Sequence, residues 1–343
     1  MITHPAVLAV LTADGITLLI LALAGWTALR IALHWSPGAA DRDQLALEAD
    51  AEAAAVAGRL ALGLAGVATG LFVVAVTAIL PGLVPGAMCG TGVFQGMSGL
   101  GGRAMAFRGI GLGLLFLWGV VEGLNRRHPE GPLTRTAARL LLLALPVVTL
   151  GAVETARAVF ALDLHQPVSC CAVVYDQIRS PEAARTTAGL PDRFWVGACL
   201  VLGAATLTGA ARLIRCRTPD RCPAIATTVA TTAFLPAAAI ALVRVLSAYH
   251  YGVLHHHCPW CLFLPDHRLV GYPLFGALAL VAVEGIAAAA AVKVGRRVPD
   301  LAPAATVRLR KSGRRILAGW TVFALLALLP PVVWRIRYGV WMG

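Results

Sequence analysis

The chain has 343 residues, of which 58% are hydrophobic and only 13% are charged, and its formal net charge is +12. Its mean hydropathy of +0.77 lies well above the range of soluble domains. This composition excludes an ordinary soluble protein, and the long apolar runs leave no room for a sizeable soluble domain.

Eight apolar runs follow one another along the chain. Each is long enough to cross a bilayer, which takes about 20 residues. They cover residues 5–34, 58–84, 104–124, 136–162, 193–213, 224–250, 271–292 and 316–338. Because lipid offers the backbone no hydrogen-bond partner, these runs must be helices. We therefore predict an all-α fold, a polytopic transmembrane bundle in which residues 1–343 form a single integral membrane domain. The first run is too long for a cleavable signal peptide, so none is expected.

Basic residues are distributed unevenly between the two sides of this bundle. The connections after the first, third, fifth and seventh runs hold 19 of the 29 Lys and Arg residues, and the opposite side holds 10. The positive-inside rule therefore puts both termini outside. In a bacterial-type cell this side is the periplasm, and we expect a protein of the bacterial inner membrane. The stretch 293–315 contributes most of the bias. We expect its charges to lie beside anionic lipid and not beside nucleic acid.

Two local patterns bear on how the helices begin and pack. The acidic stretch 41–52 predicts a solvated helical extension on the cytoplasmic side. Two small-residue motifs, Gly66 with Gly70 and Gly109 with Gly113, predict close helix–helix approach.

Cysteine and histidine gather on the predicted periplasmic side. Cys89 lies after the second run, the vicinal pair Cys170–Cys171 lies after the fourth, and the sequence HHHCPWC, residues 255–261, lies after the sixth. Five of the eight cysteines are on this side; Cys199 lies within a run, and Cys216 and Cys222 lie on the cytoplasmic side. We expect the three periplasmic connections to converge at one aqueous surface.

A soft-metal site is the first interpretation of this cluster. Thiolates bind Cu(I) and Zn(II), and imidazoles bind copper and zinc. The Cys-x-x-Cys spacing suits two ligands, the adjacent histidines add nitrogen donors, and a methionine adds a thioether. The vicinal cysteines resemble those of mercuric-ion membrane transporters. The candidate metal ligands are Met88, Cys89, Cys170, Cys171, His255, His256, His257, Cys258 and Cys261.

Thiol–disulfide chemistry is the second interpretation. Cys-Pro-Trp-Cys resembles the active dithiol of glutaredoxin-like proteins. The whole arrangement resembles quinone-linked, disulfide-generating membrane proteins of the vitamin-K-epoxide-reductase type, although those have a four- or five-helix core. The resemblance implies that Cys258 and Cys261 face a quinone, with Cys89 and Cys170 or Cys171 as the shuttle. Thiolates near histidine or arginine would react faster.

Two neighbouring side chains are candidate cofactor contacts. Arg244 could contact a quinone or an anion, and His250 could hold a haem with another histidine. A third interpretation has no chemistry at all, because exposed cysteines of an oxidising compartment often only staple loops. The odd number of periplasmic cysteines argues against a purely structural set.

Four sequence blocks resemble a family of uncharacterised bacterial multi-pass membrane proteins. They are GAMC at 86–89, SCC at 169–171, HHCPWC at 256–261 and GYPL at 271–274. The resemblance covers most of the chain and implies that the blocks belong together, but it implies no activity.

Charged residues within the apolar runs are costly in lipid and usually face the bundle interior. Asp14, Glu154 and Glu284 are of this kind. Glu154 and Glu284 could act as relay carboxylates beneath the cysteine face. Alternatively, Glu154 pairs with Arg157 on the same helix face, or with Arg244, and only holds helices together.

Taken together, the residues favour an inner-membrane protein with a periplasmic Cys/His site for a soft metal ion, preferably copper, that is handed on or transported. A quinone-coupled thiol–disulfide oxidoreductase is the alternative, and a structural subunit with stapled loops is the third. The expected partners are the lipid bilayer and a periplasmic metallochaperone or a thioredoxin-like protein, with no nucleic acid. Whether the protein is an enzyme stays open.

Overall fold

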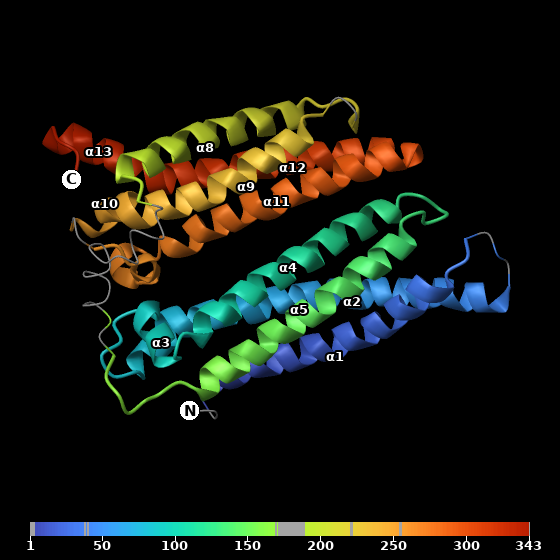
Figure 1. The fold of residues 1–343 in the computed structure, drawn as a ribbon, viewed down its shortest axis with the longest axis horizontal. Coiled ribbons are helices and arrows are strands. Elements are labelled where there is room, and N and C mark those ends of the chain that lie inside the picture. Colours follow the sequence, from blue (N-terminus) through green and yellow to red (C-terminus); the bar gives the residue numbers. More distant parts are fainter. Residues whose placement is uncertain are drawn as a thin grey trace. The chain divides into compact units, whose positions relative to one another are not determined.

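The computed structural model describes residues 4–342 apart from residues 38, 40, 169, 171–188, 220–221 and 254–255. Within this part of the chain the secondary structure is helical and contains no strand (Figure 1). Eight helical segments are long and apolar enough to cross a membrane. The prediction of an all-α, multi-pass membrane protein is therefore confirmed.

Most spans have the predicted bounds to within a few residues. The main helices are α1 (Pro5–His34), α2 (Arg42–Val74), α4 (Leu100–Asn125), α5 (Thr134–Phe160), α8 (Asp192–Ile214), α9 (Ala224–Ala241), α11 (Gly271–Arg297), α12 (Ala302–Phe323) and α13 (Leu329–Tyr338). Two helices are short: α3 (Gly90–Gly96) lies in the connection after the second span, and α10 (Ala248–Tyr251) forms the end of the sixth span. Single π-helical turns, Leu242–Leu246 and Ala324–Leu328, join α9 to α10 and α12 to α13.

Two spans begin earlier than the apolar runs. The acidic stretch 41–52 forms the first turns of α2, as expected, with Asp41 capping the helix through the N–H of Gln44. The last span begins at Pro299, not at residue 316, because the basic stretch before it is helical. The mean hydropathy of an amphipathic, arginine-rich helix is too low to indicate a membrane span. The sequence therefore predicted a connection there.

The chain divides into two compact units. Unit 1 comprises residues 1–84, 93–166 and 293–305, and unit 2 comprises residues 85–92, 167–292 and 306–343. The short segment 85–92 follows α2 and precedes α4 in the chain, yet it belongs to unit 2. The expectation of a single membrane domain stays a prediction.

Unit 2 is held together by close helix contacts and by one buried carboxylate. A Cβ at Gly209 of α8 would lie 2.6 Å from Thr227 Oγ1 of α9, so these two helices pack at a glycine. Glu284 of α11 is fully buried and accepts from Arg308 at 2.8 Å and Arg315 at 2.7 Å, both from α12. A buried charge in lipid needs such partners. Two arginines of the basic stretch therefore serve as internal counterions.

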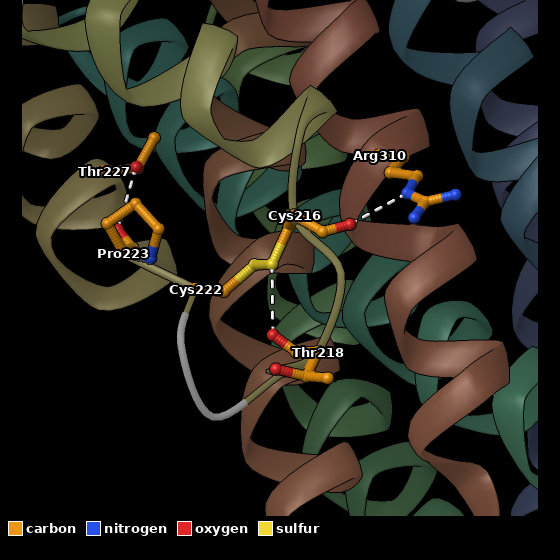
Figure 2. Close-up of a disulfide and its surroundings, with 6 residues drawn as sticks. All are labelled: Cys216, Thr218, Cys222, Pro223, Thr227 and Arg310. Carbon is orange, nitrogen blue, oxygen red and sulfur yellow. Dashed lines mark hydrogen bonds between the residues drawn. A yellow bond between two sulfur atoms is a disulfide. The ribbon is translucent and has the colours of Figure 1, made fainter.

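A disulfide joins Cys216 and Cys222 in the connection between α8 and α9, with their Cα atoms 5.8 Å apart (Figure 2). The basic-residue bias predicts the cytoplasmic side for both residues, and their spacing alone does not predict that they pair.

Unit 1 is a bundle of α1, α2, α4 and α5 in which α4 packs on α5 and α1 on α2. The closest approach occurs at Gly58, where an added Cβ would collide with the ring of Trp118. At the four glycines of the two predicted small-residue motifs, an added Cβ would meet no described atom within 4 Å. That prediction was wrong, because the glycines that carry helix contacts lie outside both motifs.

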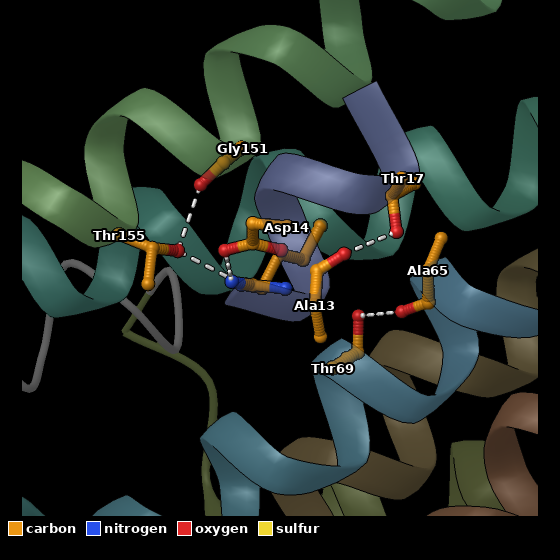
Figure 3. Close-up of polar contacts among 8 residues, drawn as sticks. Ala13, Asp14, Thr17, Ala65, Thr69, Gly151 and Thr155 are labelled. Atoms are coloured by element: carbon orange, nitrogen blue, oxygen red, sulfur yellow. Dashed lines mark hydrogen bonds and ion pairs between the residues drawn. The ribbon is translucent and has the colours of Figure 1, made fainter. Parts of the chain in front are cut away.

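Unit 1 buries its charges as ion pairs. Arg108 of α4 pairs with Asp14 of α1 and donates through Nε to Thr155 of α5, in the surroundings that Figure 3 shows. Glu154 accepts from Arg103 at 3.0 Å and from Arg157 at 2.8 Å, so the expected i,i+3 pair is present. These pairs link three helices and compensate charge where water is scarce.

Candidate metal centre

Four cysteines from three separate segments of unit 2 lie together. Cys89 Sγ is 3.4 Å from Cys170 Sγ and 3.4 Å from Cys258 Sγ. The sulfurs of Cys89, Cys258 and Cys261 all lie within 4.8 Å of one another. The sulfurs of Cys89, Cys258 and Cys261 are close enough to share a single ion, and Cys170 lies beside Cys89. Cys171 lies outside the described residues.

Val168 is held against the segment 85–92 by backbone contacts. The N–H of Val168 donates to the carbonyl of Pro85 at 2.9 Å. Gly86 has a φ of +77°, and a Cβ at this position would collide with the carbonyl oxygen of Val168. Only glycine adopts this backbone readily and admits this approach. The Gly86 turn therefore sets Cys170 beside Cys89.

The Cys-Pro-Trp-Cys segment is placed by aromatic packing. Residues Pro259–Phe263 form a short 3-10 helix that carries Cys261. The Trp260 ring lies over Gly90, where an added Cβ would be 3.0 Å from the ring, and it stacks on Phe263 with ring centres 5.5 Å apart. The Phe263 ring in turn covers Gly271 at the start of α11. A larger residue at position 90 would push Trp260, and with it both cysteines, away from Cys89.

The sulfurs are almost completely removed from solvent. Cys89 and Cys258 are each 1% exposed, and Cys170 and Cys261 are buried as well. Thr91 Oγ1 lies 3.0 Å from Cys258 Sγ and can donate to a thiolate there. The hydroxyl of Tyr251 donates to the Cys258 carbonyl. Thr91 and Tyr251 thus fix the sulfur and the backbone of one cysteine.

Two of the four thiols have a lowered pKa, and the other two have a raised pKa. Hydrogen bonds with Cys261 and Cys89 lower the pKa of Cys258, although burial opposes them, while the interaction with Cys258 raises the pKa of Cys261. In the same way the contact with Cys170 lowers the pKa of Cys89, and the contact with Cys89 raises the pKa of Cys170. The cluster therefore favours thiolate at Cys89 and Cys258, stabilised by protonated neighbours.

The described histidines contact groups other than these sulfurs. The His256 ring lies edge-on to Tyr251 with centres 4.5 Å apart, and burial lowers the pKa of this histidine. His257 Nδ1 lies 3.0 Å from the carbonyl of Val243, and His250 Nε2 lies 2.8 Å from that of Leu326. Among the described residues, the one group of three mutually close metal-ligand atoms is made of sulfur alone. His255 lies outside the described residues.

The remaining predicted site residues have other surroundings. Met88 is 66% exposed although it precedes Cys89. Arg244 pairs with Asp192. Glu154 and Glu284, the two predicted relay carboxylates, form the ion pairs described above. Their proposed roles stay predictions.

Four residues that shape the site were not predicted: Gly86, Gly90, Thr91 and Tyr251. The signal for three of them is local, because glycine and threonine surround Cys89 in the sequence GAMCGTG. Small residues beside a cysteine indicate that another segment packs closely there. Tyr251 carries no such signal, since a tyrosine at a helix end is common in membrane proteins.

Comparisons with protein-family models, with curated proteins and with solved structures gave no match to this chain.

Proposed function

We propose that this chain is a bacterial inner-membrane protein whose buried cysteine cluster binds a soft metal ion and hands it on or transports it. One observation carries the proposal: the sulfurs of Cys89, Cys258 and Cys261 lie within 4.8 Å of one another, inside a chain with eight candidate spans. Three cysteine sulfurs at this separation can share one ion, whose binding would release the remaining thiol proton.

Copper(I) is the ion that we favour. Soft thiolate ligands select Cu(I), zinc and iron–sulfur clusters, and structural zinc almost always takes four ligands. The mutually close set contains three sulfurs, which suits the lower coordination number. Cys170, whose sulfur lies 3.4 Å from that of Cys89, supplies a neighbouring thiol to which the ion can pass.

The orientation belongs to the same proposal. The excess of Lys and Arg on the opposite connections favours a periplasmic cysteine cluster, so a periplasmic metallochaperone is the expected donor or acceptor. The resemblance of the GAMC, SCC and HHCPWC blocks to bacterial multi-pass proteins is consistent with this location.

Metal analysis of anaerobically purified full-length protein tests the proposal. We expect stoichiometric copper in the wild-type chain and its loss in the Cys258→Ser and Cys261→Ser variants. Cys199→Ser is the matched control, because Cys199 is equally buried but lies within α8. Metal-free wild-type protein after reconstitution with Cu(I), or equal occupancy in all variants, would contradict the proposal.

Thiol–disulfide exchange is a second candidate, favoured by the row of sulfurs from Cys170 through Cys89 to Cys258, with two neighbouring distances of 3.4 Å. In this scheme Cys258 and Cys261 form a disulfide and pass two electrons and two protons to a quinone, which becomes a quinol. The oxidised pair then takes electrons from a thioredoxin-like partner through Cys89 and Cys170. Alkylation mapping with and without added quinone distinguishes this scheme from metal binding. Unreactive disulfides that do not change, in a metal-free protein, would contradict both schemes.

A further inference from the structure

The disulfide and the cysteine cluster lie at opposite ends of the helices of unit 2. Cys222 lies two residues before the helical segment Ala224–Tyr251, and Cys258 lies seven residues after it. Its 28 residues correspond to roughly 40 Å at about 1.5 Å per residue. Figure 1 shows the α8–α9 connection at one end of unit 2 and α10 at the other. A membrane around these helices therefore separates the two groups of sulfur.

The sequence around the disulfide is rich in arginine. Four arginines lie between residues 212 and 221 of the sequence, and a fifth, Arg310 of α12, donates from Nε to the carbonyl of Cys216 at 2.9 Å. By the positive-inside rule this end is cytoplasmic. Disulfides of the cytosol are rare, and those that occur are usually transient, catalytic or redox-sensing. Positive charge beside a thiol also favours the reactive thiolate.

The connection accommodates the reduced form as well. Cys216 Sγ lies 3.1 Å from the carbonyl oxygen of Thr218, which a free thiol can use as a hydrogen-bond acceptor (Figure 2). The Cα atoms are 5.8 Å apart, within the range of natural disulfides. The backbone contact between Cys216 and Arg310 does not involve sulfur, so it can persist in both states.

We propose that Cys216 and Cys222 form a second thiol–disulfide site, a reversible redox pair on the cytoplasmic end of unit 2. The reaction partner is a disulfide of the glutathione or thioredoxin class. One cysteine thiolate attacks that disulfide and releases a thiol. The second cysteine then attacks the mixed disulfide, forms the Cys216–Cys222 bond and releases a second thiol. Two electrons leave the pair, and the partner disulfide becomes two thiols. The inference rests on the proposed orientation but not on the proposed metal.

A redox titration of the full-length protein in native membranes tests the inference. Samples are equilibrated in buffers with different ratios of reduced to oxidised glutathione, trapped with a maleimide, and mapped by mass spectrometry. As the buffer becomes more reducing, we expect the peptides of Cys216 and Cys222 to gain two maleimide groups in one reversible transition. A pair that stays oxidised at every ratio is a structural staple, and a pair that stays alkylated is never a disulfide; either result overturns the inference.

Three controls keep this result separate from the metal centre. Cys216→Ser should abolish the transition, because Cys222 then has no partner in the connection. A Cys258→Ser, Cys261→Ser double variant, which removes the proposed metal ligands, should leave it unchanged. A membrane-impermeant maleimide added to intact cells should not label reduced Cys222. Labelling from outside would overturn the orientation and the redox inference, while copper occupancy would remain a separate measurement.

Discussion

The two units of the chain differ in what they do with polar groups inside a membrane protein. All eight cysteines belong to unit 2 and none to unit 1. In the described part of unit 1, the buried carboxylates of Asp14 and Glu154 pair with arginines. An ion pair is satisfied internally and leaves little for a ligand, whereas a buried thiol keeps lone pairs for metal or sulfur. We therefore expect the ion pairs of unit 1 to contribute to stability, and the sulfurs of unit 2 to carry the proposed chemistry.

The largest effect should come from breaking a pair in unit 1. Asp14→Ala leaves Arg108, whose side chain is 5% exposed, buried without its counterion. Removing one partner of such a pair costs about 3–5 kcal/mol. Size-exclusion chromatography of heated samples in detergent should show that the variant unfolds at a lower temperature than the wild type. Copper bound per folded chain should stay at the wild-type value.

The double variant Asp14→Leu, Arg108→Leu is the matched control, because replacing both charges with apolar groups is often close to neutral. It should recover most of the stability lost by Asp14→Ala. If Asp14→Ala instead removed copper from a well-folded protein, the division of roles between the units would be wrong.

A smaller effect is expected from Gly86→Ala in unit 2. A left-handed backbone costs a residue with a Cβ about 1–2 kcal/mol. The Cβ would also collide with the carbonyl of Val168, so the segment that carries Cys170 must move away from Cys89. Alkylation of Cys170 should become faster than in wild-type protein. Gly82→Ala, where a Cβ meets no described atom within 4 Å, should leave the rate unchanged.

Thr91→Val should have a modest effect on the centre itself. The change preserves shape but removes the hydroxyl that lies 3.0 Å from Cys258 Sγ. A hydrogen bond to a charged group contributes about 1.5–3 kcal/mol, so Cu(I) affinity, measured by competition with a chelator, should change by roughly tenfold or more. Thr91→Ser retains the hydroxyl and should bind as the wild type does. Equal affinity in Thr91→Val would show that this contact does not affect the thiolate.

The smallest effect is expected from His256→Ala. This ring packs edge-on against Tyr251, and the mutually close ligand set contains no imidazole among the described residues. Copper occupancy should therefore remain at the wild-type level. A loss of copper in this variant would make an imidazole part of the centre and would restore the mixed Cys/His site that the sequence suggested.

Hydropathy and loop chemistry predicted much of this arrangement. Apolar length located the spans because a helix must cover the bilayer thickness. Successive connections alternate between the two sides of the membrane. This alternation predicted that Cys89, Cys170 and the Cys258–Cys261 segment lie on one face. A membrane makes such a prediction possible, because each connection can lie on only one of two sides.

Features that depend on side-chain packing could not be predicted in this way. Arg308 and Arg315 of the last span pair with Glu284, and these contacts join positions that are distant in the sequence. The roles of the histidines depend on ring directions that adjacent positions do not reveal. Pairing of Cys216 with Cys222 depends on the path of a short connection, which spacing alone leaves open.

The sequence distance between the sulfurs also affects how the protein is made. Cys89 precedes Cys258 by 169 residues. At about 5–20 residues per second, the ribosome needs roughly ten to thirty seconds to complete the interval. During that time Cys89 has been inserted, yet two of its later neighbours have not been synthesised. The nascent chain must pass through this period without trapping an early thiol in a wrong bond, so biogenesis should be most sensitive to oxidants before the seventh span emerges.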